Sequence, residues 1–439
     1  MRQGGNHLLR VLGVAFGVAA VVGGTIGQGI LRSPGLVAGG VPQPWLIILL
    51  WALGGAVIAI DAMSTIELAA SIRGTGGPYS FVTRTFGRFP GLLTGVADWL
   101  GYAGAIAFIA VVFGEYLHRL GIAGGVPIGW LAVALIAAMG GIQALGTRIG
   151  GASQEIGSAI KALIFAALIV GLLVAPRSAP VAAALPAAPL TLTGLIVAIR
   201  SILGTYLGWN QAAYYGEEVK DPGRSIMRAT FAGIALVTAI YVAVNVALLT
   251  VLTPAEMAGS TLVAADAAAR VFGPAADTIV TAVSLISLVT ILNLFLMTMP
   301  RLLFAISRDA GIPYISRVSA NGSPQYAIVL MAVVAALLAT IGVYTILLAF
   351  SVWLITAVAV SVNVAAIALR AREPDLDRPW RMPFFPLPAI FAMLVNLAFL
   401  AAFLFDTPDT ALKATALAGI VAGIVYFATR RTPRPARTP

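Results

Sequence analysis

Long apolar stretches follow one another along almost the whole chain, and they limit its fold more than any other feature. A helix needs about 20 apolar residues to cross the ~30 Å hydrocarbon core of a bilayer. We identify twelve such stretches: 11–40, 45–71, 91–120, 126–147, 152–175, 191–217, 225–252, 275–300, 325–342, 345–369, 387–405 and 410–428. The sequence therefore predicts an all-α integral membrane protein with 12 transmembrane helices, and the first stretch is too long for a cleavable signal peptide.

The composition excludes several other classes of protein. Of the 439 residues, 60% are hydrophobic and only 10% are charged, against roughly 25% charged in a soluble domain. Too few polar groups remain to cover a soluble surface, which argues against a cytosolic enzyme, a disordered scaffold and a nucleic-acid binder. Cysteine is absent, so neither a disulfide framework nor a thiolate metal site is expected.

The basic residues predict how the chain is oriented. Lys and Arg number 27 against 17 Asp and Glu. With a cytoplasmic N-terminus, 20 of the 27 lie in inner loops and tails and five at outer ends. This distribution predicts a multi-pass protein of the inner (cytoplasmic) membrane with both termini cytoplasmic, and no nucleic-acid partner is needed to explain the excess. The basic tail 429–439 is expected to be solvated, or alternatively to contact anionic membrane lipids.

Glycine-rich segments interrupt the first and the sixth stretch at matching positions. They read GGTIGQGI at 23–30 and SILGTYLGWN at 201–210. A glycine costs about 1 kcal/mol relative to alanine inside a helix, so several together favour unwinding. The alternative is a pair of small-residue faces for close helix packing. The matched placement favours two broken helices that line a binding site.

Broken helices offer the groups that bind a zwitterion. The N-terminus of a half-helix presents free amides and a positive dipole end to a carboxylate, and freed carbonyls can accept hydrogen bonds from an ammonium group. Such a pair is typical of inverted-repeat transporters. We expect one polytopic membrane domain, 1–439, with five-helix repeats at 11–175 and 191–369, helices 11 and 12 at 387–428, and the tail.

Five motifs in a fixed order resemble the amino acid–polyamine–organocation (APC) superfamily of permeases over nearly the whole chain. They are IGQGI with SPG at 26–35, GGPY with FG at 76–87, LGWN with EEVKDPGR at 207–224, PRLLF with RD and a proline at 300–313, and RPWR with a proline at 378–383. The resemblance implies a LeuT-like fold of five plus five inverted helices, with discontinuous helices 1 and 6 and two further helices. The G-W-N triplet is most similar to the L-type, neutral amino acid branch.

The resemblance also implies a substrate site around residues 26–30 and 204–210. The substrate carboxylate would meet the amides of Gln28, Gly29 and Ile30, beside Gly27. Its ammonium would meet the carbonyls of Ile26, Gly204 and Leu207, and its side chain would be bounded by Tyr206, Gly208, Trp209 and Asn210. Gln28 replaces the usual small serine, and Gly204 stands where relatives often have a bulky aromatic gate. Tyr206 and Trp209 could instead be packing aromatics.

Two basic residues fall inside predicted spans. Lys161 lies roughly 13–14 Å along the fifth, and the resemblance implies that its ammonium takes the place of Na⁺ between the first and eighth helices, with Ser287 and Thr290 as partners. The lysine either carries protons or holds the helices together permanently. Arg200 is expected to form an ion pair with Asp61, Glu67, Asp98 or Glu115, or else to guide an anionic group, while Glu217 and Glu218 would tie loops together.

These features predict a Na⁺-independent secondary active transporter for amino acids, neutral ones foremost, working by alternating access as a proton symporter or an exchanger. A polyamine or cationic amino acid antiporter is the alternative, but the broken segments carry no carboxylate for a cation. A membrane-embedded enzyme lacks support, because the only histidines are His7 and His118 and no catalytic cluster exists. A channel is disfavoured, because nothing resembles a selectivity filter. No cofactor or metal is expected.

Overall fold

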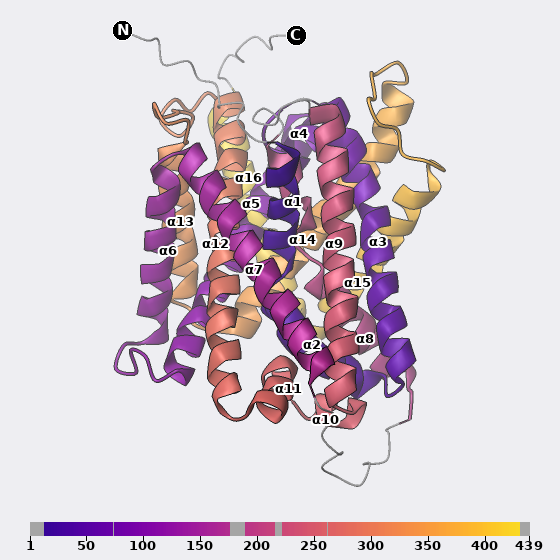
Figure 1. Cartoon of the computed structure of the whole chain (residues 1–439). Coiled ribbons are helices and arrows are strands. Elements are labelled where there is room, and N and C mark those ends of the chain that lie inside the picture. The colour runs from indigo at the N-terminus through magenta and orange to yellow at the C-terminus, as the bar shows by residue number, and fades with distance from the viewer. Residues whose placement is uncertain (1–12, 73, 176–188, 216–221, 261, 431–439) are drawn as a thin grey trace.

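The computed structural model describes residues 13–72, 74–175, 189–215, 222–260 and 262–430, and its regular elements there are all helical (Figure 1). They are α1 (Val14–Thr25), α2 (Gln28–Gly40), α3 (Pro44–Ser71), α4 (Pro78–Phe86), α5 (Arg88–Arg119), α6 (Ile128–Ala144), α7 (Thr147–Val174), α8 (Leu192–Thr205), the 3₁₀ helix η1 (Trp209–Tyr214), α9 (Pro222–Val251), α10 (Pro254–Ala258), α11 (Val263–Phe272), α12 (Ala275–Ala310), α13 (Gln325–Ala339), α14 (Tyr344–Arg372), α15 (Leu387–Asp406) and α16 (Pro408–Thr429).

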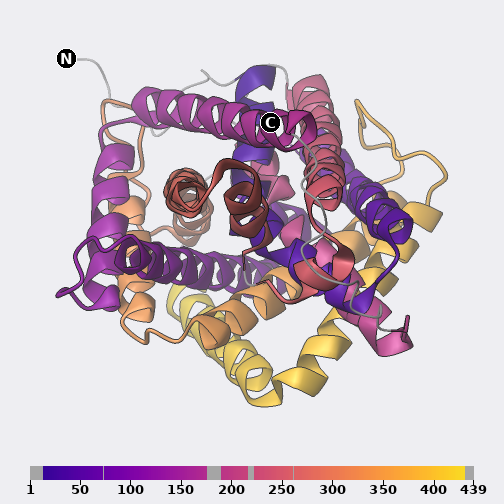
Figure 2. The same ribbon diagram turned by 60° about the horizontal axis from the view of Figure 1, so that its bottom comes forward.

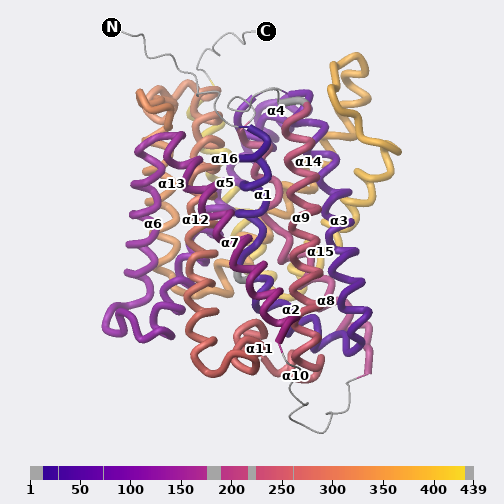
Figure 3. Tube along the Cα trace, viewed as in Figure 1, coloured from indigo at the N-terminus to yellow at the C-terminus, as the bar shows by residue number. Residues whose placement is uncertain are grey.

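Each of the twelve predicted stretches contains at least one of these helices. In the described residues, nine helical segments are long and apolar enough to cross a membrane, counting α8 with η1 as one. The pair α1 and α2 passes the same test together and is bent by 50° at its break, which the trace in Figure 3 follows. The apolar helices α6 and α13 are shorter. A total of twelve spans therefore stays a prediction, as does the side of the membrane that each end faces.

Three short helices lie at the ends of the bundle and were not expected from the apolar pattern. Helix α4 lies at the upper end in Figure 1, whereas α10 and α11 lie at the lower end. Helix α10 begins with a capping box, in which the Thr253 hydroxyl accepts from the Glu256 amide and the Glu256 carboxylate accepts from the Thr253 amide. Such local side-chain bonds can start a helix that is too short for an apolar period to reveal.

Helix α12 continues ten residues beyond the predicted end of its span, to Ala310. Arg301 marks the expected boundary because a guanidinium group is costly inside a membrane. In the structure Arg301 is buried, donates to the Thr147 hydroxyl at 3.2 Å, and stacks over the Tyr215 ring with its central carbon 5.1 Å from the centroid. Protein partners therefore satisfy the charge within the bundle.

The buried apolar side chains form two large clusters. One is built chiefly from α5, α12 and α14, with α4, α6 and α13 packed against them. The other is built chiefly from α1, α2, α3, α8 and α9, with α11. The broken helices thus pack mainly in the second cluster. Figure 2 shows the bundle with its lower end brought forward.

A buried carboxylate joins α3 to α14 and to the segment before α15. Glu67, 2% exposed, accepts from Arg370 Nε at 2.7 Å and Nη2 at 2.5 Å, and from the Met382 amide at 2.6 Å. The Arg378 guanidinium lies 3.4 Å away. Removing one member of such a group leaves the others buried without compensation, which is strongly destabilising.

We therefore expect Glu67→Gln to reduce the free energy of unfolding by about 3 kcal/mol. The matched control is Glu373→Gln, because Glu373 pairs with Arg84 and the two side chains are 36% and 33% exposed. An exposed pair of this kind contributes less than about 1 kcal/mol. Thermal unfolding in detergent would compare the variants, and equal losses of stability would contradict the assignment.

Candidate functional site

The first break lies between α1 and α2. Helix α1 ends at Thr25, and Ile26 and Gly27 adopt extended backbone conformations before α2 begins at Gln28. A helix C-terminus leaves its last carbonyls without intrahelical partners, and a helix N-terminus leaves its first amides without them. The break therefore places free carbonyls up to Ile26 opposite free amides that start at Gln28. The side chain of Gln28 lies outside the described part of the structure.

Lys161 of α7 binds the free carbonyls of α1. Its Nζ donates to Gly23 O at 3.0 Å and to Ile26 O at 2.6 Å, and the residue is only 1% exposed. A positive charge thus lies at the C-terminal end of the half-helix, where the dipole favours it. A carbonyl oxygen has two lone pairs, so Ile26 O can accept a second donor, and the family resemblance implies that this donor is a substrate ammonium.

Ser287 and Thr290 of α12 are both buried, but neither bonds to Lys161 in the described structure. The Thr290 hydroxyl donates to Ile286 O at 2.8 Å. A Cβ added at Gly157, one helical turn before Lys161, would lie 3.0 Å from Thr290 Oγ1. Helices α7 and α12 are therefore in contact near Lys161, and a shared role of the three residues in cation binding or proton coupling stays a prediction.

The second break lies between α8 and η1, and it meets the first. Helix α8 ends at Thr205, and Gly208 has a φ of +101°, a conformation that favours glycine. A Cβ added at Gly208 would lie 2.4 Å from Gly24 O, and one added at Gly24 would lie 2.8 Å from Gly208 O. The two broken helices thus approach each other backbone to backbone, which only glycine at both positions allows.

Tyr241 of α9 joins the two breaks, and sequence reasoning missed it. Its hydroxyl lies 2.8 Å from Thr25 O and 3.0 Å from Thr205 O, so one donor serves the free carbonyls of both half-helices. A hydrogen bond between Ser33 Oγ of α2 and Thr205 Oγ1 of α8, 2.7 Å apart, also links the two broken helices. The sequence offers only a tyrosine in a largely apolar span that also contains Thr238 and Asn245, and this pattern identifies no partner.

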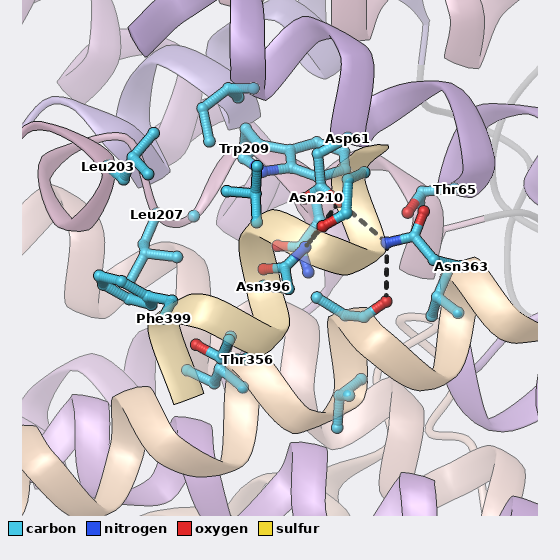
Figure 4. Close-up of a pocket in the computed structure, with 18 of the residues that line it drawn as sticks. Asp61, Thr65, Leu203, Leu207, Trp209, Asn210, Thr356, Asn363, Asn396 and Phe399 are labelled. Carbon is cyan, nitrogen blue, oxygen red and sulfur yellow. Dashed lines mark hydrogen bonds between the residues drawn. The ribbon is translucent and has the colours of Figure 1, made fainter. Parts of the chain in front are cut away.

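Next to the second break lies a cavity of about 60 Å³, room for roughly four to six water molecules at about 10–15 Å³ each. Figure 4 shows it between the break and helices α3, α14 and α15. Of the predicted site residues, those that line it are Leu207, Gly208, Trp209 and Asn210. Its other polar lining residues, which the sequence did not assign to the site, are Asp61, Thr65, Tyr102, Thr356, Asn363 and Asn396.

The remaining predicted site residues lie away from this cavity. Ile26 and Ile30 are fully buried at the first break, and Gly29 packs against Thr205, so both breaks share one region. Tyr206 points into the core, where its hydroxyl donates to Trp51 O at 3.0 Å and its ring packs against Trp51 and Tyr241. A Cβ added at Gly204 meets nothing within 4 Å, so there is open space at the position where relatives often have an aromatic gate.

Arg200 forms an ion pair, but not with any of the four acids proposed from the sequence. Its partner is Asp406 at the end of α15, and its guanidinium stacks over Phe403 at 4.3 Å. Glu67 binds Arg370, and Asp98 accepts from the Tyr214 hydroxyl at 2.5 Å. Arg200 of α8 thus reaches the end of α15, a contact that no local pattern in the sequence reveals. Glu217 and Glu218 lie outside the described residues.

The chain is similar to known transport proteins along nearly its whole length. A family model described as amino acid permease matches residues 8–428. The chain is 27% identical to the b(0,+)-type amino acid transporter 1 of Mus musculus over 92% of this chain and 84% of that protein. It is 28% identical to the serine/threonine exchanger SteT of Bacillus subtilis (strain 168), over 88% and 90%. The large neutral amino acids transporter small subunit 2 of Mus musculus is 28% identical, over 86% and 73%.

The contact of the two breaks generates a test with two glycines. We expect Gly208→Ala to reduce the free energy of unfolding by more than about 2 kcal/mol, because a left-handed alanine costs roughly 1–2 kcal/mol and its Cβ would press on Gly24 O. Gly204→Ala is the control, since it adds the same methyl group to a helix in open space and should be neutral or stabilising by up to about 1 kcal/mol. Thermal unfolding that treats both variants alike would contradict the backbone contact.

Proposed function

The chain belongs to the amino acid permease family of the APC superfamily, and on this premise we propose that it is a Na⁺-independent secondary active transporter. It moves amino acids, neutral ones foremost, across the cytoplasmic membrane. Transport runs by alternating access, as proton symport or as exchange of one amino acid for another. The relatives that it matches are transporters rather than enzymes.

The observation that carries this proposal is the meeting of two interrupted helices at Gly24 and Gly208. Their free amides and carbonyls suit a zwitterion, which needs donors for its carboxylate and acceptors for its ammonium. The proposed donors are the amides of Gln28, Gly29 and Ile30, with Gly27 beside them. The proposed acceptors are the carbonyls of Ile26, Gly204 and Leu207, and the side chain extends toward Gly208, Trp209 and Asn210.

The two hydrophobic clusters support a movement of one body against another. The broken helices pack mainly with α3 and α9 in one cluster, while α5, α12 and α14 dominate the other. In a twelve-span protein with two inverted five-helix repeats, 11–175 and 191–369, such bodies would rock around a fixed midplane site. Helices 11 and 12 would follow at 387–428, and both termini would face the cytoplasm.

Lys161 supports independence from Na⁺. Its ammonium group donates to two carbonyls at the end of α1, at 3.0 Å and 2.6 Å, and the resemblance to the family implies that it takes the place of a sodium ion there. A lysine that releases and regains its proton would couple transport to a proton gradient, with Ser287 and Thr290 nearby on α12. A lysine that stays charged would leave exchange as the mechanism.

Purified protein in liposomes tests the transport function. A thermal-shift screen against the twenty amino acids and common polyamines selects the substrate, and its uptake is then measured with and without internal amino acid, Na⁺ and a pH gradient. We expect saturable uptake whose rate does not depend on Na⁺ and increases with either internal substrate or the pH gradient. Stabilisation by a polyamine alone would favour the antiporter alternative, and flux that does not saturate would favour a channel.

Replacing Lys161 tests the coupling. We expect Lys161→Met to abolish stimulation of uptake by an inward proton gradient while substrate binding persists, because methionine keeps a long unbranched side chain but has no amine that could carry a proton. The control is Lys413→Met, since Lys413 lies exposed on α16 and should leave the stimulation unchanged. Undiminished proton-driven uptake by the Lys161 variant would remove the lysine from the coupling mechanism.

A further inference from the structure

Asp61 brings a carboxylate into the cavity beside the second break. It lies in α3, seventeen residues after Pro44, and lines the cavity together with Trp209 and Asn210 (Figure 4). Neither glycine-rich segment contains an acidic residue, so the sequence of the breaks gave no reason to expect a negative charge here. The packing of α3 against α14 and α15 supplies it.

Only one oxygen of this carboxylate is bonded. Asp61 Oδ1 accepts from Asn363 Nδ2 of α14 and from Asn396 Nδ2 of α15, each at 3.0 Å. Asn363 is itself held in place, because its Oδ1 accepts from Ser64 Oγ at 2.6 Å. Asp61 Oδ2 has no donor among the described residues, and Asp61 faces the cavity. The carboxylate is therefore fixed in orientation with one oxygen left for a ligand.

No cationic side chain offsets this charge in the described part of the chain. Asp61 has two carboxamide partners and no ion pair there. An acidic group at this depth in a transmembrane helix is costly unless a positive charge or a polar cavity compensates it. A cation that enters the cavity would supply the missing compensation.

The walls of the cavity suit an ammonium group on an alkyl chain. Leu203, Leu207 and Ile355 provide apolar surface for methylene groups, and the rings of Trp209 and Phe399 also line it. Aromatic faces attract cations. The Thr356 hydroxyl is buried with no partner in the described structure and lines the same space. The cavity volume of about 60 Å³ leaves room for such a head group.

We propose that Asp61 is a specificity-determining residue, and that the cavity it faces binds the terminal ammonium group of an amino acid side chain. The inference rests on the proposed transport function, and it extends the substrates from neutral amino acids to those with a side-chain amine. The substrate's backbone groups stay at the two breaks. Its side chain passes Leu207 and Asn210, which line both the break and the cavity, and ends at Asp61 Oδ2.

L-lysine and L-norleucine test this inference, because they share a carbon chain and differ by the terminal amine. Binding of each is measured on the full-length protein in detergent by calorimetry. The wild type should bind lysine at least as tightly as norleucine. Asp61→Asn retains the acceptor for Asn363 and Asn396 but removes the charge, so we expect it to weaken lysine binding about tenfold or more and to leave norleucine binding within about twofold.

Asp375→Asn is the matched control, since it removes the same charge from an exposed segment after α14 and should change neither affinity. Norleucine binding by the Asp61 variant shows that its site is intact. The proposal is overturned if Asp61→Asn leaves the ratio of the two affinities unchanged, or if the wild type binds norleucine and rejects lysine. Both of those results leave the transport function standing, whereas a wild type that binds no amino acid would refute that function itself.

Discussion

Free backbone groups at two broken helix ends are the constraint on which the rest of this structure depends. In a low-dielectric interior an unpaired carbonyl or amide costs several kcal/mol, so an interrupted helix persists only if something binds its ends. Lys161 takes the carbonyls of Gly23 and Ile26, and the Tyr241 hydroxyl is shared between Thr25 and Thr205. The breaks are thus maintained by side chains from α7 and α9, the helices that flank them.

The need for backbone contact also explains the glycines. Because Gly24 and Gly208 touch through their main chains, no side chain separates the two sets of free groups, and they face one small region. The apolar packing on either side forms two clusters rather than one, with the broken helices mainly in one of them. The ion pair of Glu67 with Arg370 lies near the C-terminal ends of α3 and α14. The interior can therefore be polar and locally irregular without loss of the fold.

Lys161 and Asp61, two charged residues near the breaks, have different hydrogen-bond partners. Lys161 is buried, and its ammonium group donates to the backbone carbonyls of Gly23 and Ile26 at the end of α1. Asp61 receives only neutral carboxamide donors on one oxygen and faces a cavity with the other. Neutral donors orient a carboxylate without neutralising it, which leaves its field available to a ligand. The lysine is thus bound to main-chain carbonyls, whereas the carboxylate keeps one oxygen for a ligand.

The sequence by itself determined the features that depend on local composition. Apolar length predicts the long helices, the glycines at 23–30 and 201–210 predict the two breaks, and a lone lysine in the fifth span predicts a buried charge. All three follow from the preferences of residues close together in the chain, and the structure has helices, breaks and Lys161 where they were expected. The cytoplasmic orientation and the roles of the site residues stay predictions.

Only the tertiary structure decided which distant residues meet. Tyr241 lies 216 positions from Thr25 and Asp61 302 positions from Asn363, separations over which no periodicity carries information. The same holds for Arg200, whose partner proved to be Asp406, and for Tyr206, whose ring turns into the core against Trp51. Helix rotation and tilt settle these pairings, and both are set by the packing of whole faces rather than by any single residue.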